Sequence, residues 1–138
     1  MPLKELQLTK RNKTSTGKKQ IYVVDDDESV RRALKFLINA FGFEVRTFSC
    51  AEEFFSAVPN GVPGCLIVDI HMPGLSGWEV QQKLIKTGSK LPVIIISADK
   101  DDGLKEQALK AGAVGFLQKP FNDQELFDLI NRVIPRYN

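Results

Sequence analysis

The side chains that could carry out chemistry in this sequence stand at the ends of short apolar runs. Three carboxylates follow Ile21–Val24, a fourth closes Cys65–Val68, and a hydroxyl and a lysine come at two later runs. These residues are Asp25, Asp26, Asp27, Asp69, Ser97 and Lys119. Carboxylates crowded at one place either raise the pKa of one of their number or bind a hard cation. Two carboxylates, a backbone carbonyl and waters make an octahedral oxygen shell, so the pattern favours a Mg2+ site.

Lys119 and Ser97 extend the chemistry that such a site could perform. A lysine that faces several acids can be a plain ion pair. A metal ion, an ammonium and a hydroxyl at one place, however, are the groups that bind a phosphoryl group of about two negative charges. The sequence contains neither GxxxxGK[ST] nor GxGxxG, so a loop that cradles a nucleotide is not expected. Phosphoryl chemistry is therefore the leading hypothesis.

The sequence argues against a zinc site and against a disulfide framework. Its one histidine is His71, and Cys50 and Cys65 have no Cys or His nearby at the spacing of zinc ligands. Two cysteines are also too few for a disulfide-stabilised fold, so we expect free thiols in a reducing compartment. No apolar run approaches the roughly 18 residues of a membrane helix, and residues 1–19 lack the apolar core of a signal peptide. These features predict a cytoplasmic protein with no membrane contact.

Strands and helices must alternate to bring these side chains together. From residue 20 onward, apolar runs rich in β-branched residues alternate with helical patterns, which is typical of repeated βα units. Runs such as Leu66–Val68 are continuously apolar, as strands buried on both faces are, whereas Glu44–Phe48 alternates and is predicted at a sheet edge. The sequence thus predicts an α/β fold, a single doubly wound (βα)5 domain with a five-stranded parallel sheet. The predicted strands are Gln20–Asp25, Glu44–Phe48, Cys65–Asp69, Val93–Ser97 and Gly115–Gln118.

Several helix starts are marked by capping residues. Asp27 precedes an amphipathic pattern that Gly42 closes, so it is predicted to cap that helix. Three further pairs have the spacing of a capping box: Ser49 with Glu52, Ser76 with Glu79, and Asn122 with Glu125. The fourth helix is the weakest, because its apolar stripe is thin. That stripe consists of Leu104, Ala108 and Ala111.

The net charge of +2 is unevenly distributed along the chain. Residues 1–19 carry six basic side chains and one acidic one, a net charge of +5. The rest of the chain carries 13 basic and 16 acidic side chains, a net charge of −3. We therefore expect a basic flexible arm over residues 1–19 and one domain over residues 20–138. An acidic domain is a poor candidate for reading a nucleic-acid groove, so no direct nucleic-acid binding by this chain is predicted.

Four segments, taken in order, resemble the receiver domain of two-component response regulators. The likeness extends from residue 20 to about residue 134, and the segments are Val23–Asp27, Ile67–Gly77, Ile96–Ala98 and Gly115–Phe121. The resemblance implies a flavodoxin-like fold and a role in phosphorylation-dependent signalling. In its Lys110–Ala113 and Lys119–Phe121 blocks the sequence looks closest to receivers that regulate transcription through a helix-turn-helix output.

The resemblance implies roles for the acidic residues. Asp69 would accept a phosphoryl group from the phosphohistidine of a sensor histidine kinase or phosphotransfer protein. Asp26 would bind Mg2+ directly, Asp25 through water and Asp69 through its carboxylate. His71 would contribute its backbone carbonyl. The protein would then catalyse only its own phosphorylation and dephosphorylation, and would not be an enzyme with a separate substrate.

The resemblance also implies how the signal would leave the site. Lys119 would pair with the phosphoryl oxygens, and the Ser97 hydroxyl would move to hydrogen-bond them. Phe116 would follow as the switch aromatic behind Ser97. The changed surface, made by the fourth helix, the fifth strand and the fifth helix, would bind a partner or form a homodimer.

Two questions stay open at the level of sequence. The rival function is a haloacid-dehalogenase-like phosphatase, because residues 25–29 satisfy the DxDx[ST] pattern with Asp25 as nucleophile. That reading leaves Asp69 and the Met72–Gly74 loop unexplained, and it lacks the further acidic pair expected after the lysine. The output is also open, because a receiver of this length is either a stand-alone protein or a fragment of a longer regulator.

Overall fold

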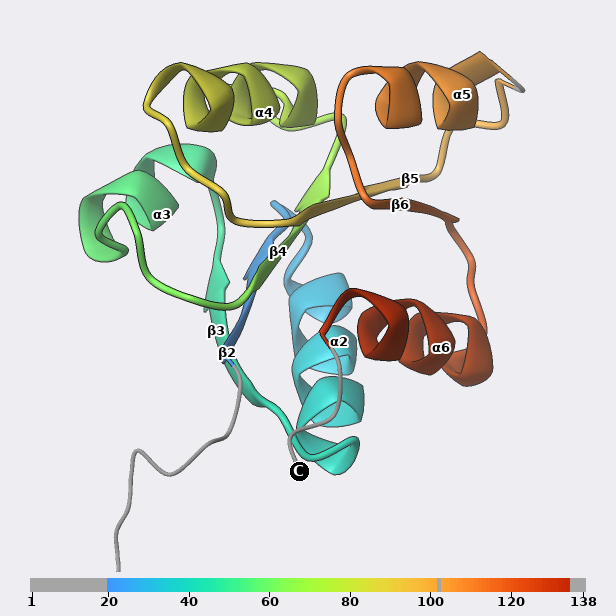
Figure 1. Ribbon diagram of the computed structural model, residues 1–138. Helices are drawn as coiled ribbons and strands as arrows, with labels where there is room; N and C mark the ends of the chain where they lie inside the picture. The colour runs from blue at the N-terminus through green and yellow to red at the C-terminus, as the bar shows by residue number, and fades with distance from the viewer. Residues whose placement is uncertain (1–19, 102, 135–138) are drawn as a thin grey trace, which may run out of the picture.

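The computed structural model describes residues 20–101 and 103–134, in which strands and helices alternate (Figure 1). The strands are β2 (Gln20–Val24), β3 (Glu44–Phe48), β4 (Cys65–Asp69), β5 (Val93–Ser97) and β6 (Gly115–Gln118). The helices are α2 (Glu28–Ala40), α3 (Ala51–Ala57), α4 (Gly77–Lys86), α5 (Gly103–Lys110) and α6 (Asp123–Val133). The predicted arm, residues 1–19, lies outside the described residues, so the boundary at residue 20 stays a prediction.

The sheet has the predicted parallel architecture. Its five strands run in the order β3-β2-β4-β5-β6, and every neighbouring pair is parallel. All five predicted strands are present, and the first is one residue shorter than predicted, because Asp25 follows the last strand residue, Val24. The alternating segment Glu44–Phe48 lies at an edge, as predicted. Because the chain moves outward from β2 to β3 and then returns to pair β4 with β2, the order reverses between β2 and β4, where α/β sheets bind ligands.

Helices cover both faces of the sheet and create two apolar cores. In Figure 1, α3, α4 and α5 lie on one face, and α2 and α6 lie on the other. Successive strand residues point to opposite faces, so Val24 packs in the core under α3–α5 whereas Val23 packs in the core under α2 and α6. Burial on both faces explains why β4 and β5 are buried along their whole length. This packing fixes the strand ends that carry the polar side chains.

The helix caps agree with the sequence at three of four places. The Asp27 side chain accepts hydrogen bonds from the first turn of α2, and the Ser76 and Asn122 capping boxes are complete. The Ser49–Glu52 prediction is wrong, because Cys50 is the N-cap of α3 and makes no side-chain cap. Ser49 instead donates through its backbone N–H and its hydroxyl to Glu53, each at 2.8 Å. The helix begins one residue later than the spacing suggested.

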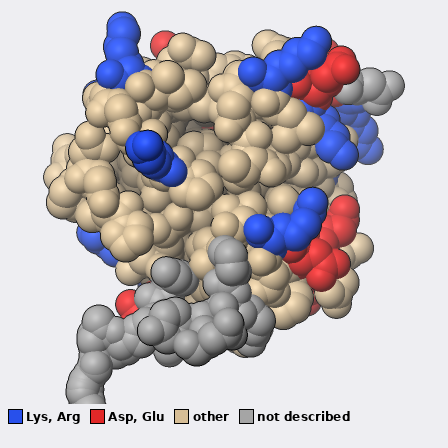
Figure 2. Space-filling model, viewed as in Figure 1, with Lys and Arg blue, Asp and Glu red and all other residues tan. Residues whose placement is uncertain are grey.

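Three predictions, on membrane spans, on the distribution of basic side chains and on the cysteines, can be compared with the described residues. None of the helices in these residues is both long enough and apolar enough to cross a membrane. On the face shown in Figure 2, Lys and Arg side chains lie scattered and do not form one continuous stripe. Cys50 and Cys65 are both free thiols, as predicted.

Candidate functional site

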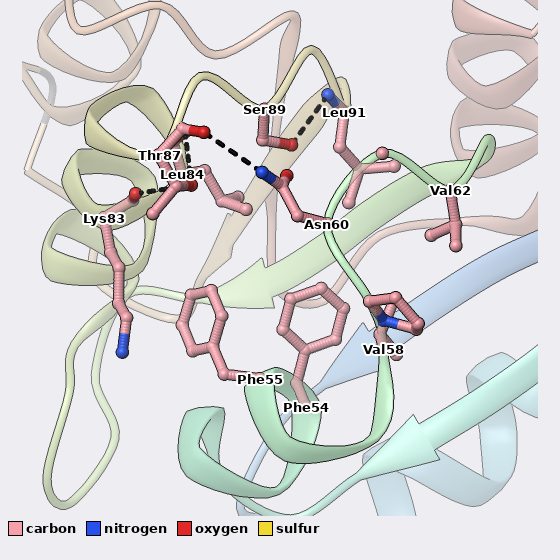
Figure 3. A pocket seen from close by; sticks show the side chains of 12 residues that line it. Phe54, Phe55, Val58, Asn60, Val62, Lys83, Leu84, Thr87, Ser89 and Leu91 are labelled. Atoms are coloured by element: carbon pink, nitrogen blue, oxygen red, sulfur yellow. Dashed lines mark hydrogen bonds between the residues drawn. The ribbon is translucent and has the colours of Figure 1, made fainter.

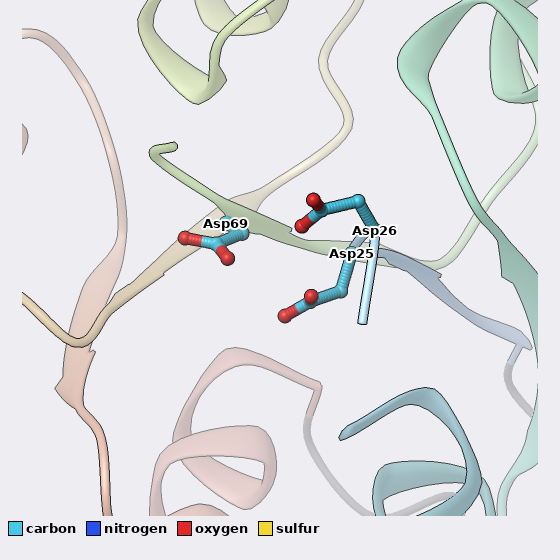
Figure 4. A group of neighbouring side chains, drawn as sticks. All are labelled: Asp25, Asp26 and Asp69. Atoms are coloured by element: carbon cyan, nitrogen blue, oxygen red, sulfur yellow. The ribbon is translucent and has the colours of Figure 1, made fainter. Parts of the chain in front are cut away.

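Three carboxylates meet at the carboxyl ends of β2 and β4. These strands pair in register up to Val24 and Val68, so the residues that follow them lie side by side. Asp25, Asp26 and Asp69 each offer a carboxylate oxygen, and these oxygens lie within 4.8 Å of one another. Figure 4 shows the Asp25 and Asp26 carboxylates pointing from the end of β2 toward the side where Asp69 lies. The predicted proximity of these three acids is therefore confirmed, and the Asp27 side chain instead caps α2.

Lys119 joins this cluster from the segment after β6. Its ammonium donates to Oδ2 of Asp25 at 2.9 Å and to Oδ2 of Asp69 at 3.0 Å. Asp25 has no exposed surface and Asp69 is only 6% exposed, so both ion pairs are largely shielded from solvent. Asp26 is exposed. The cluster thus has two buried acids bridged by one lysine and a third acid open to solvent.

Burial and neighbouring charges shift the pKa values of Asp25 and Lys119. Burial raises the pKa of the Asp25 carboxyl, and the nearby charge of Asp69 raises it further, against the lowering effect of the Asp27 N–H and of Lys119. Burial alone would lower the pKa of Lys119, but its hydrogen bonds to Asp25 and Asp69 outweigh this and raise it. The lysine therefore stays charged, and a divalent cation would relieve the remaining repulsion among the acids.

Ser97 and Phe116 occupy neighbouring strands beside the acids. Ser97 ends β5 and is fully buried, and its hydroxyl oxygen accepts a hydrogen bond of 3.0 Å from the Asp99 N–H. The Ser97 carbonyl accepts a 2.7 Å hydrogen bond from the backbone N–H of Lys119, which directly follows β6, so this bond continues the pairing of β5 with β6. Phe116 on β6 pairs with Ile95 and is partly buried in the core under α3–α5. The hydroxyl, the lysine and the aromatic ring are therefore connected through the β5–β6 ladder.

His71 lies in the loop after Asp69 and is exposed. Its backbone N–H donates to Oδ1 of Asp69 at 3.2 Å, and its Nε2 lies 3.5 Å from Oδ2 of Asp99. The loop after β4 therefore lies against the Asp69 carboxylate. The side chains of His71 and Asp99 stand at the solvent side of the cluster.

The residues present fit a hard divalent cation. Mg2+ takes oxygen ligands at about 2.0–2.1 Å in an octahedron, which places ligand oxygens within about 4.2 Å of one another. Small adjustments of the three carboxylates, whose oxygens lie within 4.8 Å, would meet that requirement. The donors are all oxygen, and neither described cysteine belongs to the cluster. This chemistry suits Mg2+ and disfavours zinc.

An apolar cavity of about 250 Å3 lies elsewhere, between α3 and α4 (Figure 3). Its lining includes residues 58–62 together with Thr87, Ser89 and Leu91, so it adjoins the amino ends of β4 and β5, opposite the acids. Its one titratable side chain, Lys83, has its ammonium 4.5 Å from the centre of the Phe55 ring. Without an acid, base or nucleophile paired in it, the cavity offers no chemistry comparable to that of the carboxylate cluster.

Comparison with known proteins finds receiver domains. The family model for the response regulator receiver domain matches residues 21–131. The transcriptional regulatory protein TdiR of Thauera aromatica is 41% identical over 129 residues, which cover 94% of this chain and 55% of TdiR. The transcriptional regulatory protein FixJ of Bradyrhizobium diazoefficiens is 40% identical over 119 residues, covering 86% of this chain and 58% of FixJ. The chain thus spans a little over half the length of these two relatives.

Solved structures agree with this match. The crystal structure of FixJ-N superposes with a TM-score of 0.78 at 34% identity and covers 87% of this chain and 96% of that one. The BeF3-activated DrrB receiver domain superposes with a TM-score of 0.77 at 26% identity and covers 86% of this chain and 99% of that one. The flavodoxin-like fold predicted from sequence is therefore confirmed.

Proposed function

Because the chain belongs to the response regulator receiver family, we propose that it takes a phosphoryl group onto Asp69 from a sensor histidine kinase or a phosphotransfer protein. The family is one of signalling proteins, not metabolic enzymes, and this gives no support to the rival phosphatase with Asp25 as nucleophile. The single observation that carries the proposal is the bridge from Lys119 to Asp25 and Asp69 beside the exposed carboxylate of Asp26. We further propose that the reaction takes place in the cytoplasm.

Asp69 is the best candidate for the nucleophile. One of its carboxylate oxygens would form a bond to phosphorus while the bond from phosphorus to the donor imidazole nitrogen breaks, and the imidazole leaves with its electron pair and takes up a proton. The Lys119 ammonium already lies 3.0 Å from Asp69, so it is placed to pair with the phosphoryl oxygens as they arrive. Asp25 is less suited, because it has no exposed surface, whereas Asp69 keeps 6% of its surface exposed.

Asp25, Asp26 and Asp69, with the His71 backbone carbonyl, would hold Mg2+ in this proposal. When bound, the cation would offset the negative charge that gathers as the phosphoryl group approaches the acids. Lys119 contributes one positive charge against three carboxylates, so the cluster without a cation would repel a phosphoryl group. The proposal therefore predicts that phosphorylation requires a divalent cation.

We also propose an output surface. Ser97 would shift to donate its hydroxyl to the phosphoryl group, and Phe116 would move into the space behind it. These residues lie on β5 and β6, so the surface that changes is the one formed by α5, β6 and α6. That surface would bind a partner or a second receiver. Because TdiR and FixJ are longer transcriptional regulators, a partner that controls transcription fits the proposal.

The test is labelling with acetyl phosphate and Mg2+, followed by mass measurement of the intact protein. The parent protein should gain one phosphoryl group, and Asp69→Asn should gain none. Asp27→Asn is the matched control, because Asp27 only caps α2 and its replacement should leave labelling in place. Labelling that survives Asp69→Asn but disappears with Asp25→Asn would instead support the phosphatase.

A further inference from the structure

Asp26 is the member of the acid cluster with the least side-chain support. Lys119 fixes the carboxylates of Asp25 and Asp69, and the His71 N–H also donates to Asp69. Within residues 20–101 and 103–134, no hydrogen bond or ion pair holds the exposed Asp26 carboxylate. The backbone alone therefore sets the direction of the Asp26 Cα–Cβ bond, from which the carboxylate reaches the cluster.

The two peptide groups that flank Asp26 are each held by a hydrogen bond. The carbonyl of Asp25, which belongs to the peptide group before Asp26, accepts a 2.7 Å hydrogen bond from the guanidinium of Arg31. The N–H of Asp27, which belongs to the peptide group after Asp26, donates to Oδ1 of Asp25 at 2.9 Å. With both flanking peptide planes held, the backbone angles of Asp26 have little freedom. Arg31 supplies the first of these two restraints.

Arg31 is itself well fixed. It lies in the first turn of α2, and its backbone N–H donates to the Asp27 carbonyl at 3.0 Å. Hydrogen bonds from Ser49 and, more weakly, the charge of Arg31 hold the pKa of the Glu53 carboxyl on α3 below its ordinary value. Arg31 is half-buried, whereas its neighbour Arg32 has a side chain that is 80% exposed. The half-buried guanidinium is therefore held by its hydrogen bond to the Asp25 carbonyl.

We infer that Arg31 is a positioning residue for Mg2+ binding, because it fixes the peptide group that aims Asp26 into the carboxylate cluster. This inference rests on the proposed function. Arg31 contacts neither the cation nor the phosphoryl group in it, and acts only through the backbone of Asp25 and Asp26. Removal of Arg31 should therefore weaken the binding of Mg2+ more than it slows the phosphorylation reaction once Mg2+ is saturating.

The experiment compares Arg31→Met with Arg32→Met. Both changes remove one positive charge from α2 and keep an unbranched apolar stem, so they alter the long-range field similarly. Loss of a positive charge near a cation site should by itself strengthen Mg2+ binding. Weaker binding in Arg31→Met therefore cannot come from charge. Isothermal titration calorimetry with MgCl2 measures the Mg2+ affinity. Acetyl phosphate labelling at varied Mg2+ concentration gives separately the Mg2+ concentration for half-maximal labelling and the maximum labelling rate.

We expect Arg31→Met to raise the Mg2+ dissociation constant about tenfold, the scale found when a residue that orients a metal ligand is lost. Arg32→Met should stay within about twofold of the parent, and Arg31→Lys, which keeps a shorter donor, should lie between. The labelling rate at saturating Mg2+ should fall much less than the affinity does. A residue that only stabilised the fold would lower the melting temperature without this separation.

Three outcomes separate a failure of the inference about Arg31 from a failure of the proposed function. Equal Mg2+ affinity in Arg31→Met and Arg32→Met, with affinity lost in Asp26→Ala, would overturn the inference and leave the proposed function standing. A parent protein that neither binds Mg2+ nor is labelled would overturn both. If Arg31→Met does not fold, Arg31→Lys decides, and parent-like Mg2+ affinity in that variant would count against the inference.

Discussion

Lys119 and Asp25 form an ion pair of 2.9 Å in which the carboxylate has no exposed surface. Such a pair stabilises the fold only if the attraction exceeds the cost of removing both charges from water. For Asp25 the balance is unfavourable, because burial and the charge of Asp69 raise the pKa of its carboxyl despite Lys119. The ionised carboxylate of Asp25 therefore lowers the stability of the fold, as expected for a group with a function.

The first prediction is that Asp25→Asn stabilises the domain at neutral pH. A carboxyl whose pKa is raised by folding favours the folded state below its unfolded pKa, near 3.8, and loses that contribution as pH rises through its folded pKa. Asparagine removes this loss and can keep the hydrogen bond from the Asp27 N–H. The melting temperature should rise by a few degrees at pH 7, which corresponds to about 1 kcal/mol for a domain of this size. Circular dichroism melts between pH 4 and pH 7 should show the gain shrinking as pH falls.

Asp27→Asn is the control for that prediction, and its effect on stability should have the opposite sign. Hydrogen bonds from Ser29 and Val30 hold the pKa of the Asp27 carboxyl below its ordinary value, so its contribution is present at neutral pH and lost as pH falls. Asparagine caps helices about as well as aspartate, so the loss at pH 7 should be small. A destabilised Asp25→Asn protein at pH 7 would contradict the account of the buried pair.

The second prediction concerns Gly77, which starts α4 directly behind the proposed phosphoacceptor. A Cβ atom at this position would lie 2.7 Å from the Asp69 carbonyl oxygen and 3.0 Å from the Cα of Ile70. These are backbone atoms, so Gly77→Ala must displace either α4 or the segment that carries Asp69, and we expect the segment to move. We expect a loss of about 1–3 kcal/mol in the free energy of unfolding, together with slower labelling by acetyl phosphate.

Gly103→Ala provides the matched control for Gly77→Ala. Gly103 also starts a helix, α5, but the nearest atom to its added Cβ is Oδ1 of Asp101 at 3.5 Å, an ordinary contact. Alanine there should leave labelling unchanged and stability equal or slightly higher. Urea unfolding of both variants checks the comparison, and equal stability of the two would show that α4 can shift away from Asp69.

The sequence could predict the site because parallel strands place their carboxyl ends at one edge. Continuous apolar runs predicted β2, β4 and β5. The polar residue at the end of each run therefore had to lie at the edge formed by the carboxyl ends of the strands. That logic was enough to gather Asp25, Asp69 and Ser97 without any knowledge of side-chain geometry, and the run Gly115–Gln118 added Lys119 at the same edge. It could not assign their chemical roles, because an ion pair, a metal site and a phosphoacceptor can be built from the same residues.

Two local features could not be predicted from spacing. The capping pattern at Ser49 and Glu52 failed because Cys50 keeps an extended backbone, so α3 starts later and Glu53 faces Ser49. Arg31 carried no signal either, because an arginine on an amphipathic helix has the same pattern as its exposed neighbour Arg32. Only the three-dimensional position of the Asp25 carbonyl distinguishes the two arginines.

The third prediction uses the two free cysteines. Cys65 starts β4 with no exposed surface, and burial raises the pKa of its thiol to about 12, so the reactive thiolate is scarce and inaccessible. Cys50 is only partly buried. A disulfide reagent such as DTNB should therefore modify one thiol in the native protein and two in denaturant. Cys50→Ser should remove the native reaction, and rapid modification of both thiols in the native protein would contradict this burial of β4.

The last prediction tests how phosphorylation would become a signal. The Ser97 hydroxyl oxygen accepts from the Asp99 N–H, and the Ser97 carbonyl accepts from the Lys119 N–H. A phosphoryl group on Asp69 can shift a conformational equilibrium only if it bonds better in one state than in the other, and the Ser97 hydroxyl is the donor that would make this difference. Ser97→Ala should therefore still be labelled but should lose most of its phosphorylation-dependent dimerisation or partner binding. The factor by which phosphorylation strengthens dimerisation or partner binding should fall about tenfold in Ser97→Ala. Ser97→Thr, which keeps a hydroxyl, should retain that factor. Sedimentation of labelled and unlabelled protein measures the response, and a full response in Ser97→Ala would mean that the signal reaches α5, β6 and α6 without Ser97 and Phe116.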